Sequence, residues 1–286
     1  MKLSYFPGCS LDGTAKEYGL STQAVCQELG LELLEVPDWN CCGASSGHST
    51  NYLLGHALAA RNLILAEQQG LDLVVACAAC FSRFKKTDIV LKQNAELNRK
   101  MEEIMGIPYK GGFEIRHLLD VICNTIGLET IREKVTNPLN DLKLVPYYGC
   151  VIVRPQELTQ FDDEEQPQAM DNLIEAIGAE CLPWSEKTDC CGASLSLTRV
   201  DIVKKLAGGI VDMGKEAGAQ AIITACPLCQ ANLDMRYGED GLPVFYFTEL
   251  LGLALGIDGN SWLERHMTDP MPLLTSLKLA RGGGDE

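Results

Sequence analysis

The feature that most constrains this chain is a pattern of cysteines that occurs twice. The first half contains Cys9, then Cys41-Cys42-Gly43, then Cys77-Ala78-Ala79-Cys80. The second half repeats this order as Cys150, Cys190-Cys191-Gly192 and Cys226-Pro227-Leu228-Cys229. Four of the five equivalent cysteines are 149 positions apart and the first pair is 141 apart, because the second half has eight extra residues after its first cysteine. Such self-similarity predicts two copies of one structural unit.

Apolar segments of strand length precede the cysteines in both halves. They are Lys2–Phe6, Leu71–Ala76, Leu144–Tyr148 and Ala221–Ala225. Helices are predicted over Tyr52–Gln69 and Leu195–Gly214, after the Cys-Cys-Gly turns. Strands alternating with helices indicate parallel βαβ units. We therefore predict an α/β fold: two pseudo-symmetric copies of a cysteine-rich βαβ-type domain, with small parallel sheets and the cysteines at the carboxyl ends of strands.

The connection between the two copies is predicted to be helical over Asp88–Met105 and Ile115–Val135. The following segment, Thr136–Asp141, is rich in residues that favour turns. We place the boundary there and predict two domains, residues 1–138 and residues 139–286.

Thirteen cysteines are unusual in a chain whose N-terminus does not resemble a secretion signal. The sequence predicts a cytoplasmic protein, and the cytosol keeps thiols reduced, so metal ligation is favoured over disulfides.

A net charge of −15 argues against nucleic acid as a partner. We also expect no transmembrane segment, since no apolar run approaches the length needed. No nucleotide-binding glycine motif is present, so any flavin belongs to a partner.

The number and spacing of the cysteines favour iron–sulfur clusters. Two Cys-x-x-Cys pairs are equally typical of zinc sites, so this motif alone leaves the metal open. Adjacent cysteines such as Cys41 and Cys42 diverge, which suits two irons of one cluster better than one tetrahedral ion. A fifth cysteine in each half exceeds what zinc or an ordinary cubane cluster requires. Zinc in one or both halves and a redox-active thiol pair are the alternatives.

Other side chains are candidates for supporting roles. His48 and His56 follow the first Cys-Cys pair, and either can donate a proton near neutral pH, or can be an ordinary surface or hydrogen-bonded histidine. Cations that could bind an acidic substrate or a partner, or simply face solvent, are Arg83, Lys85, Lys86, Arg154 and Lys187. Cys26, Cys123 and Cys181 are interpreted as packing residues. His117 and His266 lack a motif, and Gly282–Glu286 is predicted to be a flexible tail.

The full pattern resembles the duplicated cysteine-rich CCG domain. Its spacing is Cys-x31-Cys-Cys-x34-Cys-x2-Cys in the first half and Cys-x39-Cys-Cys-x34-Cys-x2-Cys in the second. The opening Tyr5-Phe6-Pro7-Gly8-Cys9 and the late Leu-Leu-Gly-Leu-Ala-Leu-Gly segment resemble the B subunit of heterodisulfide reductase in particular. Gly43 and Val151 stand where the methanogen proteins tend to have Pro and His, so the chain looks closer to bacterial relatives.

The resemblance implies a noncubane 4Fe–4S cluster in each half, ten cysteine ligands, and a disulfide substrate reduced between the clusters. The implied ligands are Cys9, Cys41, Cys42, Cys77 and Cys80, and Cys150, Cys190, Cys191, Cys226 and Cys229. It also implies two partners from a heterodisulfide-reductase-like complex, one ferredoxin-like and one flavin-containing. His48 is a candidate proton donor to the reaction. The alternative is an electron-transfer protein that relays electrons between partner redox proteins without a substrate of its own.

Overall fold

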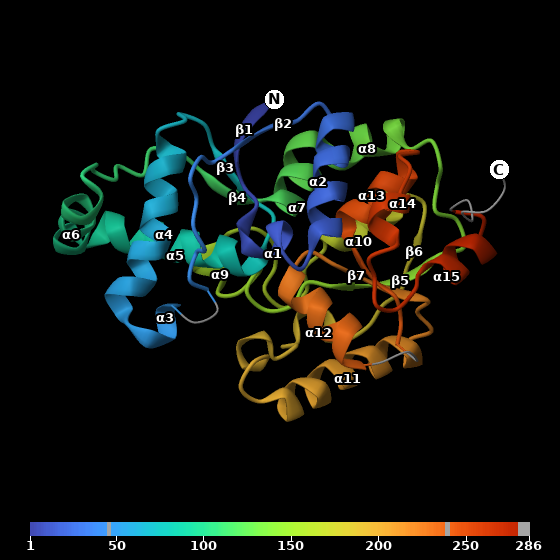
Figure 1. Cartoon of the computed structure of the whole chain (residues 1–286). Coiled ribbons are helices and arrows are strands. Elements are labelled where there is room, and N and C mark those ends of the chain that lie inside the picture. The colour runs from blue at the N-terminus through green and yellow to red at the C-terminus, as the bar shows by residue number, and fades with distance from the viewer. Residues whose placement is uncertain (45–46, 238–240, 280–286) are drawn as a thin grey trace.

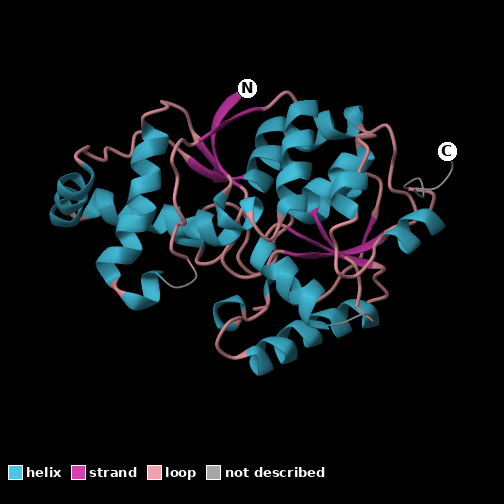
Figure 2. Cartoon of the chain, viewed as in Figure 1, coloured by secondary structure: helices cyan, strands magenta, loops and turns pink. Residues whose placement is uncertain are grey.

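Two four-stranded parallel sheets form the centre of the computed structural model, one in each half of the chain (Figure 2). The structure describes residues 1–44, 47–237 and 241–279. The strand order is β2-β1-β3-β4 in the first sheet and β6-β5-β7-β8 in the second. The matching topologies confirm the predicted α/β fold with two copies of one unit.

The elements of the two halves alternate as follows (Figure 1). The first half contains β1 (Lys2–Phe6), α1 (Gly8–Asp12), α2 (Lys16–Glu28), β2 (Glu32–Glu35), α3 (Gly47–Thr50), α4 (Tyr52–Glu67), β3 (Leu73–Val75), α5 (Ala78–Gln93), α6 (Ala95–Met105), β4 (Ile115–His117), α7 (Leu118–Asp120), the π-helix η1 (Val121–Gly127) and α8 (Leu128–Lys134). The second contains β5 (Lys143–Tyr147), α9 (Gln156–Thr159), α10 (Ala169–Ala176), β6 (Glu180–Cys181), the 3₁₀ turns η2 (Glu186–Thr188) and η3 (Ala193–Leu195), α11 (Val200–Glu216), β7 (Ala221–Thr224), α12 (Pro227–Tyr237), β8 (Val244–Tyr246), α13 (Phe247–Ala254), α14 (Asn260–Leu263) and α15 (Met271–Ser276).

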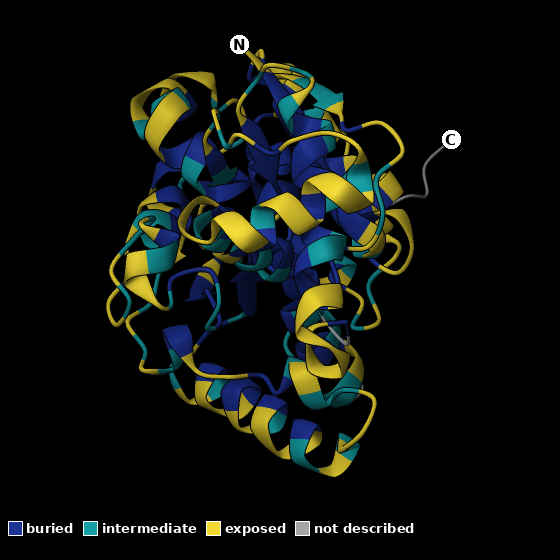
Figure 3. Ribbon diagram, turned by 90° about the vertical axis from the view of Figure 1, so that its left-hand side faces the viewer, coloured by how far each residue is buried: buried dark blue, intermediate teal, exposed yellow. Residues whose placement is uncertain are grey.

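The central strands are hydrophobic because helices cover both faces of each sheet. Every residue of β3 and β7 is buried. The outer faces of the surrounding helices are exposed, while the interior is buried (Figure 3). Phe6 pairs with Val75, and Tyr147 with Thr224. Strands β1 and β3, like β5 and β7, therefore end at the same edge, and the loops that follow them leave each sheet together.

The two halves are packed against each other through a shared core. Helix α2 of the first half packs on α13 and α14 of the second (Figure 1). The Tyr18 ring stacks on Tyr246 with centroids 4.1 Å apart. The Tyr18 hydroxyl donates to the carbonyl of Ala76 at 2.9 Å and lies 3.5 Å from that of Ala225. One buried apolar cluster includes side chains of both halves, so the two halves share a hydrophobic core. The boundary near residue 138 stays a prediction.

The helical prediction over Ile115–Val135 is wrong for its first three residues. This segment begins with strand β4, whose residues pair with β3, and then forms α7, η1 and α8. The His117 side chain accepts a hydrogen bond from the backbone N–H of Leu119 and caps α7. A strand of three residues is too short to show a strand period, and helical residues follow it at once.

The other helix predictions need shorter corrections. The stretch predicted to be helical over Asp88–Met105 contains the end of α5 and all of α6, which the Asn94 side chain caps by accepting from Leu97 N–H. The helix predicted from Leu195 begins instead at Val200. Strands β2 and β8 were not predicted, since they have only four and three residues. The predicted flexible tail lies outside the described residues.

Candidate functional site

Each cysteine motif follows the carboxyl end of a strand, as predicted. Cys9 and Cys150 come after β1 and β5, and each Cys-x-x-Cys comes after β3 or β7 and opens α5 or α12. Each Cys-Cys pair lies in the loop between the edge strand and the following helix. Parallel strands that end together thus bring all five cysteine positions of a half to one edge of its sheet.

The glycine before the first cysteine of each half lets the chain pass close to another cysteine. Gly8 and Gly149 have φ values of +77° and +67°, which glycine adopts without steric cost. A Cβ atom on Gly8 would lie 3.3 Å from the Cys80 sulfur. A Cβ on Gly149 would lie 2.9 Å from the Cys229 sulfur. The two glycines therefore make room for the second thiol of the Cys-x-x-Cys.

The glycine after each Cys-Cys pair turns the backbone toward sulfur. Gly43 and Gly192 have φ values of +76° and +78°. Their N–H groups donate to the sulfurs of Cys41 and Cys190 at 3.5 and 3.4 Å. Amide donors of this kind stabilise negative charge on a thiolate. Both glycines thus form a close turn that adds a hydrogen bond to a motif cysteine.

The thiols of each half lie in contact in pairs. Sulfur–sulfur distances are 3.9 Å for Cys9 and Cys41, 3.1 Å for Cys42 and Cys80, and 3.6 Å for Cys191 and Cys229. Within the described ranges, no group of three or more His, Cys, Asp or Glu side chains is arranged to hold a single metal ion.

The two sets of thiols meet at the interface between the halves. Cys77 and Cys226 directly follow Ala76 and Ala225, whose carbonyl oxygens lie 2.9 and 3.5 Å from the same Tyr18 hydroxyl. Both cysteines are buried, with exposed fractions of 3%. By contrast, Cys9, Cys41 and Cys190 are exposed. Each set therefore runs from a buried cysteine beside the other half to a surface that solvent reaches.

Mutual hydrogen bonding lowers the pKa of several of these thiols. Hydrogen bonds with Cys41 and Cys80 hold the pKa of Cys42 well below the ordinary value for a thiol. A hydrogen bond with Cys150 lowers the pKa of Cys190 to about 6. The same hydrogen bonds raise the pKa of the partner thiols Cys41, Cys80 and Cys150, so each group shares a thiolate, which is the form of cysteine that binds metal.

His117, which the sequence left unassigned, lies at the centre of the molecule. Its ring is fully buried, and burial lowers the pKa of His117 to about 4. Nδ1 accepts from Leu119 N–H, whereas Nε2 has no hydrogen-bond partner among the described residues. The ring packs edge-on against Phe81, next to Cys80, at a centroid distance of 5.7 Å. It is a neutral imidazole that helps to exclude water where the halves meet, and no sequence motif marks it.

The predicted proton donors lie in different surroundings. His48 is exposed, and its Nδ1 lies 3.4 Å from the carbonyl oxygen of Gly43, in the first Cys-Cys-Gly turn. His56 is buried and hydrogen-bonded to Thr87 at 3.1 Å, and burial together with nearby cations lowers its pKa. The structure therefore brings His48, and not the buried His56 ring, to the solvent side of the first site.

The predicted cations lie in two kinds of surroundings, near a motif cysteine or bound to structural partners. Arg83 lies near enough to Cys42 for the two charges to interact. Lys187 is buried and paired with Asp171, and Arg154 binds the Thr188 hydroxyl at 2.9 Å, so both have structural partners. Lys85 and Lys86 lie on the same helix as Arg83, half-buried and exposed respectively.

The three remaining cysteines lie outside the two motifs, in buried or half-buried positions. Cys26 and Cys123 are buried on α2 and η1, and Cys181 is half-buried in β6. Burial raises the pKa of Cys26 and of Cys181 to about 12, which keeps both as neutral thiols.

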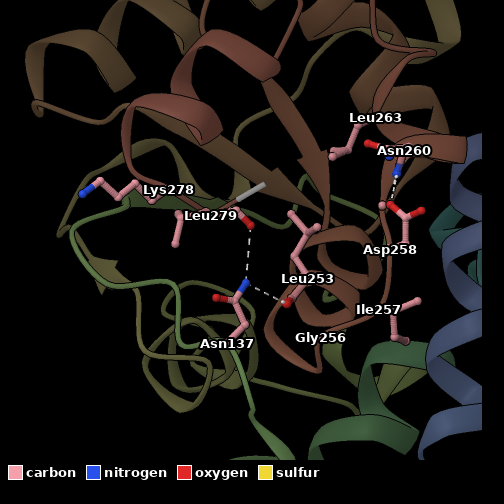
Figure 4. Close-up of a pocket in the computed structure, with 10 residues that line it drawn as sticks. Asn137, Leu253, Gly256, Ile257, Asp258, Asn260, Leu263, Lys278 and Leu279 are labelled. Atoms are coloured by element: carbon pink, nitrogen blue, oxygen red, sulfur yellow. Dashed lines mark hydrogen bonds between the residues drawn. The ribbon is translucent and has the colours of Figure 1, made fainter. Parts of the chain in front are cut away.

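A cavity of about 670 Å³ lies away from the cysteines. Asn137, Leu253, Gly256, Ile257, Asp258, Gly259, Asn260, Leu263, Lys278 and Leu279 line it. Asn137 donates to the carbonyls of Leu253 and Leu279 at 3.2 and 3.3 Å, which ties the chain connection to the C-terminal segment (Figure 4). These lining residues include no cysteine or histidine, so the cavity is not the candidate site.

Within the described residues, no helix is long and apolar enough to cross a membrane.

Two sequence relatives match nearly the whole chain. The 8-methylmenaquinol:fumarate reductase membrane anchor subunit of Wolinella succinogenes is 32% identical, over 90% of this chain and 93% of that protein. The B subunit of a ferredoxin/F(420)H(2)-dependent CoB-CoM heterodisulfide reductase from Methanosarcina acetivorans is 31% identical, over 89% of each. The crystal structure of a hypothetical protein from Helicobacter pylori shares the fold, with a TM-score of 0.71 and 14% identity. That comparison covers 94% of this chain and 52% of the other chain.

The family comparison identifies the repeated unit itself. The model of the CCG cysteine-rich domain matches twice, at residues 3–85 and 144–234. The two matches contain all ten motif cysteines and extend into the helices that follow each Cys-x-x-Cys. The chain therefore belongs to the CCG cysteine-rich domain family, carries that domain in two copies, and is similar over its length to the B subunit of heterodisulfide reductase.

Proposed function

We propose that this chain is the iron–sulfur subunit of a heterodisulfide-reductase-like complex. In this role it reduces a disulfide, or a similar sulfur substrate, by two electrons at a pair of noncubane 4Fe–4S clusters. One observation carries the proposal: two complete five-cysteine sets adjoin, because the buried Cys77 and Cys226 follow Ala76 and Ala225, whose carbonyls lie on the same Tyr18 hydroxyl. Breaking one S–S bond takes two electrons, which two neighbouring one-electron centres can provide.

The donor sets fit such clusters. The first would be held by Cys9, Cys41, Cys42, Cys77 and Cys80, and the second by Cys150, Cys190, Cys191, Cys226 and Cys229. Thiolate is the donor that iron–sulfur clusters require, and five donors exceed a closed four-coordinate zinc site. When bound, the clusters would supply one electron each to the substrate sulfurs. Zinc in one half is the main alternative.

The chain's own residues would shape this site. The N–H groups of Gly43 and Gly192 stabilise negative charge on the adjacent cysteines. The buried rings of Tyr18 and His117 exclude water from the contact between the halves. We assign His48 as the candidate proton donor, because it is exposed beside the first Cys-Cys-Gly turn and a departing thiolate must be protonated.

We further propose two partner proteins, one ferredoxin-like and one flavin-containing. The support is the similarity over about nine-tenths of the chain to proteins named as one subunit of a larger reductase. The experiment is turnover of a small disulfide with a reduced viologen dye, using anaerobically purified protein with its metal intact. Oxidation of the dye that depends on the disulfide supports the proposal. No turnover with any disulfide refutes it.

A second candidate is an electron relay without its own substrate. It is favoured by the similarity to a protein named for fumarate reductase, whose name contains no disulfide. In the same assay a relay would oxidise the dye only when a protein electron acceptor is added. The two candidates therefore predict opposite results with a disulfide alone.

A further inference from the structure

The charges beside the two Cys-Cys pairs differ at two equivalent positions. Asn40 immediately precedes the first pair, and Asp189 stands at the same place before the second. Arg83 follows the first Cys-x-x-Cys by three residues, and Asn232 follows the second by three residues. Both comparisons obey the 149-residue repeat, and the helices concerned, α5 and α12, follow topologically equivalent strands. The two differences can therefore be compared directly.

In the first half, Arg83 places a positive charge near sulfur. It lies on α5 three residues after Cys80 and is half-buried, and the Cys80 sulfur is 3.1 Å from that of Cys42. Among the described residues no carboxylate is paired with Arg83, so no neighbouring acid cancels its charge. The neighbouring position at Asn40 is neutral, and its amide donates to the carbonyls of Cys41 and Leu58 at 2.7 and 3.1 Å.

In the second half, a neutral amide takes the place of the guanidinium. Asn232 is buried, and its Nδ2 donates to the carbonyl of Cys191 at 3.1 Å and lies 3.6 Å from the sulfur of the same residue. Its Oδ1 accepts from the Ser196 hydroxyl at 3.0 Å, which fixes the orientation of the amide. Asn232 thus supports Cys191 without adding charge.

The carboxylate of Asp189 adds a negative charge beside Cys190. Asp189 directly precedes Cys190 in the chain, so its charge lies close to that residue. Lys205 lines a small cavity with Cys190, but Glu186 and Asp189 line it too, so the formal charges there sum to one negative. At the two repeated positions, the first site therefore has one positive charge and the second has one negative charge.

We propose that the two sites, once each holds a cluster, differ in reduction potential, with the cluster of the first half reduced at the higher potential. This inference rests on the proposed presence of two clusters, and it does not depend on the reduction of a disulfide. One-electron reduction adds a negative charge, which Arg83 stabilises and Asp189 opposes. The hydrogen bond from Asn232 acts in the opposite sense. This bond comes from a neutral amide, and the Gly43 and Gly192 amides donate equivalent bonds in the two halves. The charges of Arg83 and Asp189 therefore decide which cluster has the higher reduction potential.

The test is a potentiometric titration with dithionite, followed by electron paramagnetic resonance, on the anaerobically purified full chain. The signal of each half is first assigned by its loss in Cys42→Ser or Cys191→Ser. We expect the first-half signal to titrate at the higher potential. Arg83→Asn is expected to lower that midpoint alone, by at least tenfold in the reduction equilibrium, which is about 59 mV for one electron.

Asp189→Asn is the second variant, and it is expected to raise the midpoint of the second half alone. Arg132→Asn is the control, since it removes the same charge from an exposed position on α8 paired with Glu129. Equal midpoints, the reverse order, or an Arg83→Asn shift no larger than that of the control would overturn the inference and leave the proposed function standing. Absence of iron from the wild-type protein would overturn both.

Discussion

The substitution Gly149→Ala tests whether a backbone glycine sets the space for the second site. The new Cβ would lie 2.9 Å from the Cys229 sulfur, closer than real Cβ contacts come. Gly149 also has φ of +67°, where an alanine costs about 1–2 kcal/mol. The close contact displaces the Cys229 thiol, whereas the unfavourable φ lowers only the free energy of unfolding.

Two comparison variants separate these costs. Gly218→Ala has φ of +81° with no atom within 4 Å of the new Cβ, so it incurs the conformational cost alone. Gly8→Ala places its Cβ 3.3 Å from the Cys80 sulfur, a milder contact at the equivalent position of the first half. All three variants should unfold at lower denaturant concentration than the wild type, by comparable amounts from the backbone strain.

Metal content distinguishes them. We expect Gly149→Ala to lose the iron of the second half and to keep that of the first, measured as iron per folded chain after anaerobic purification. Gly8→Ala should lose a smaller fraction, from the first half, and Gly218→Ala should keep both sets. If Gly149→Ala and Gly218→Ala retained the same iron, the contact between Gly149 and Cys229 would not control ligation, and the reasoning would be refuted.

Two further predictions concern ligands and pH. Cys42→Ser should abolish the spectroscopic signal of one cluster and leave the other, and Cys191→Ser should do the converse; retention of both signals in either variant would contradict the ligand assignment. His266 is buried against Glu249 at 3.0 Å. Burial acts to lower the pKa of His266, but the charge and hydrogen bond of Glu249, with Asp234 and Glu17, outweigh it and raise the pKa to about 9. The folded pKa exceeds the ordinary 6.5, so this pairing stabilises the fold fully below pH 6.5 and is lost as pH rises through 9, on the order of 3 kcal/mol. His266→Gln should therefore be most destabilising in urea near pH 6 and nearly neutral near pH 10; a difference independent of pH would contradict this account.

The repeated cysteines allow the fold class and the placement of the cysteines after strands to be predicted, because four of the five positions recur at a spacing of 149 residues. The strands before the Cys-x-x-Cys motifs are buried apolar runs, and both lie within two residues of the predicted bounds. Helix α4 also begins at the predicted residue, Tyr52, directly after a capping Asn51 whose side chain accepts from Leu54 N–H.

What the sequence did not predict depends on contacts between distant segments. Strand β4 has three residues and is held in the sheet by pairing with β3, so no local period marks it. The central position of His117 follows from that pairing. Likewise, the closeness of Cys77 to Cys226 arises from the packing of the two halves around Tyr18, which the spacing within each half does not encode.

The measurement that tests the central claim most directly is the iron, acid-labile sulfide and zinc content of anaerobically purified protein, combined with electron paramagnetic resonance. We expect about eight irons and a similar amount of sulfide per chain, as two four-iron clusters require, together with two signals. Zinc in one half with about four irons in the other would leave one redox centre, and would contradict reduction of a substrate between paired clusters.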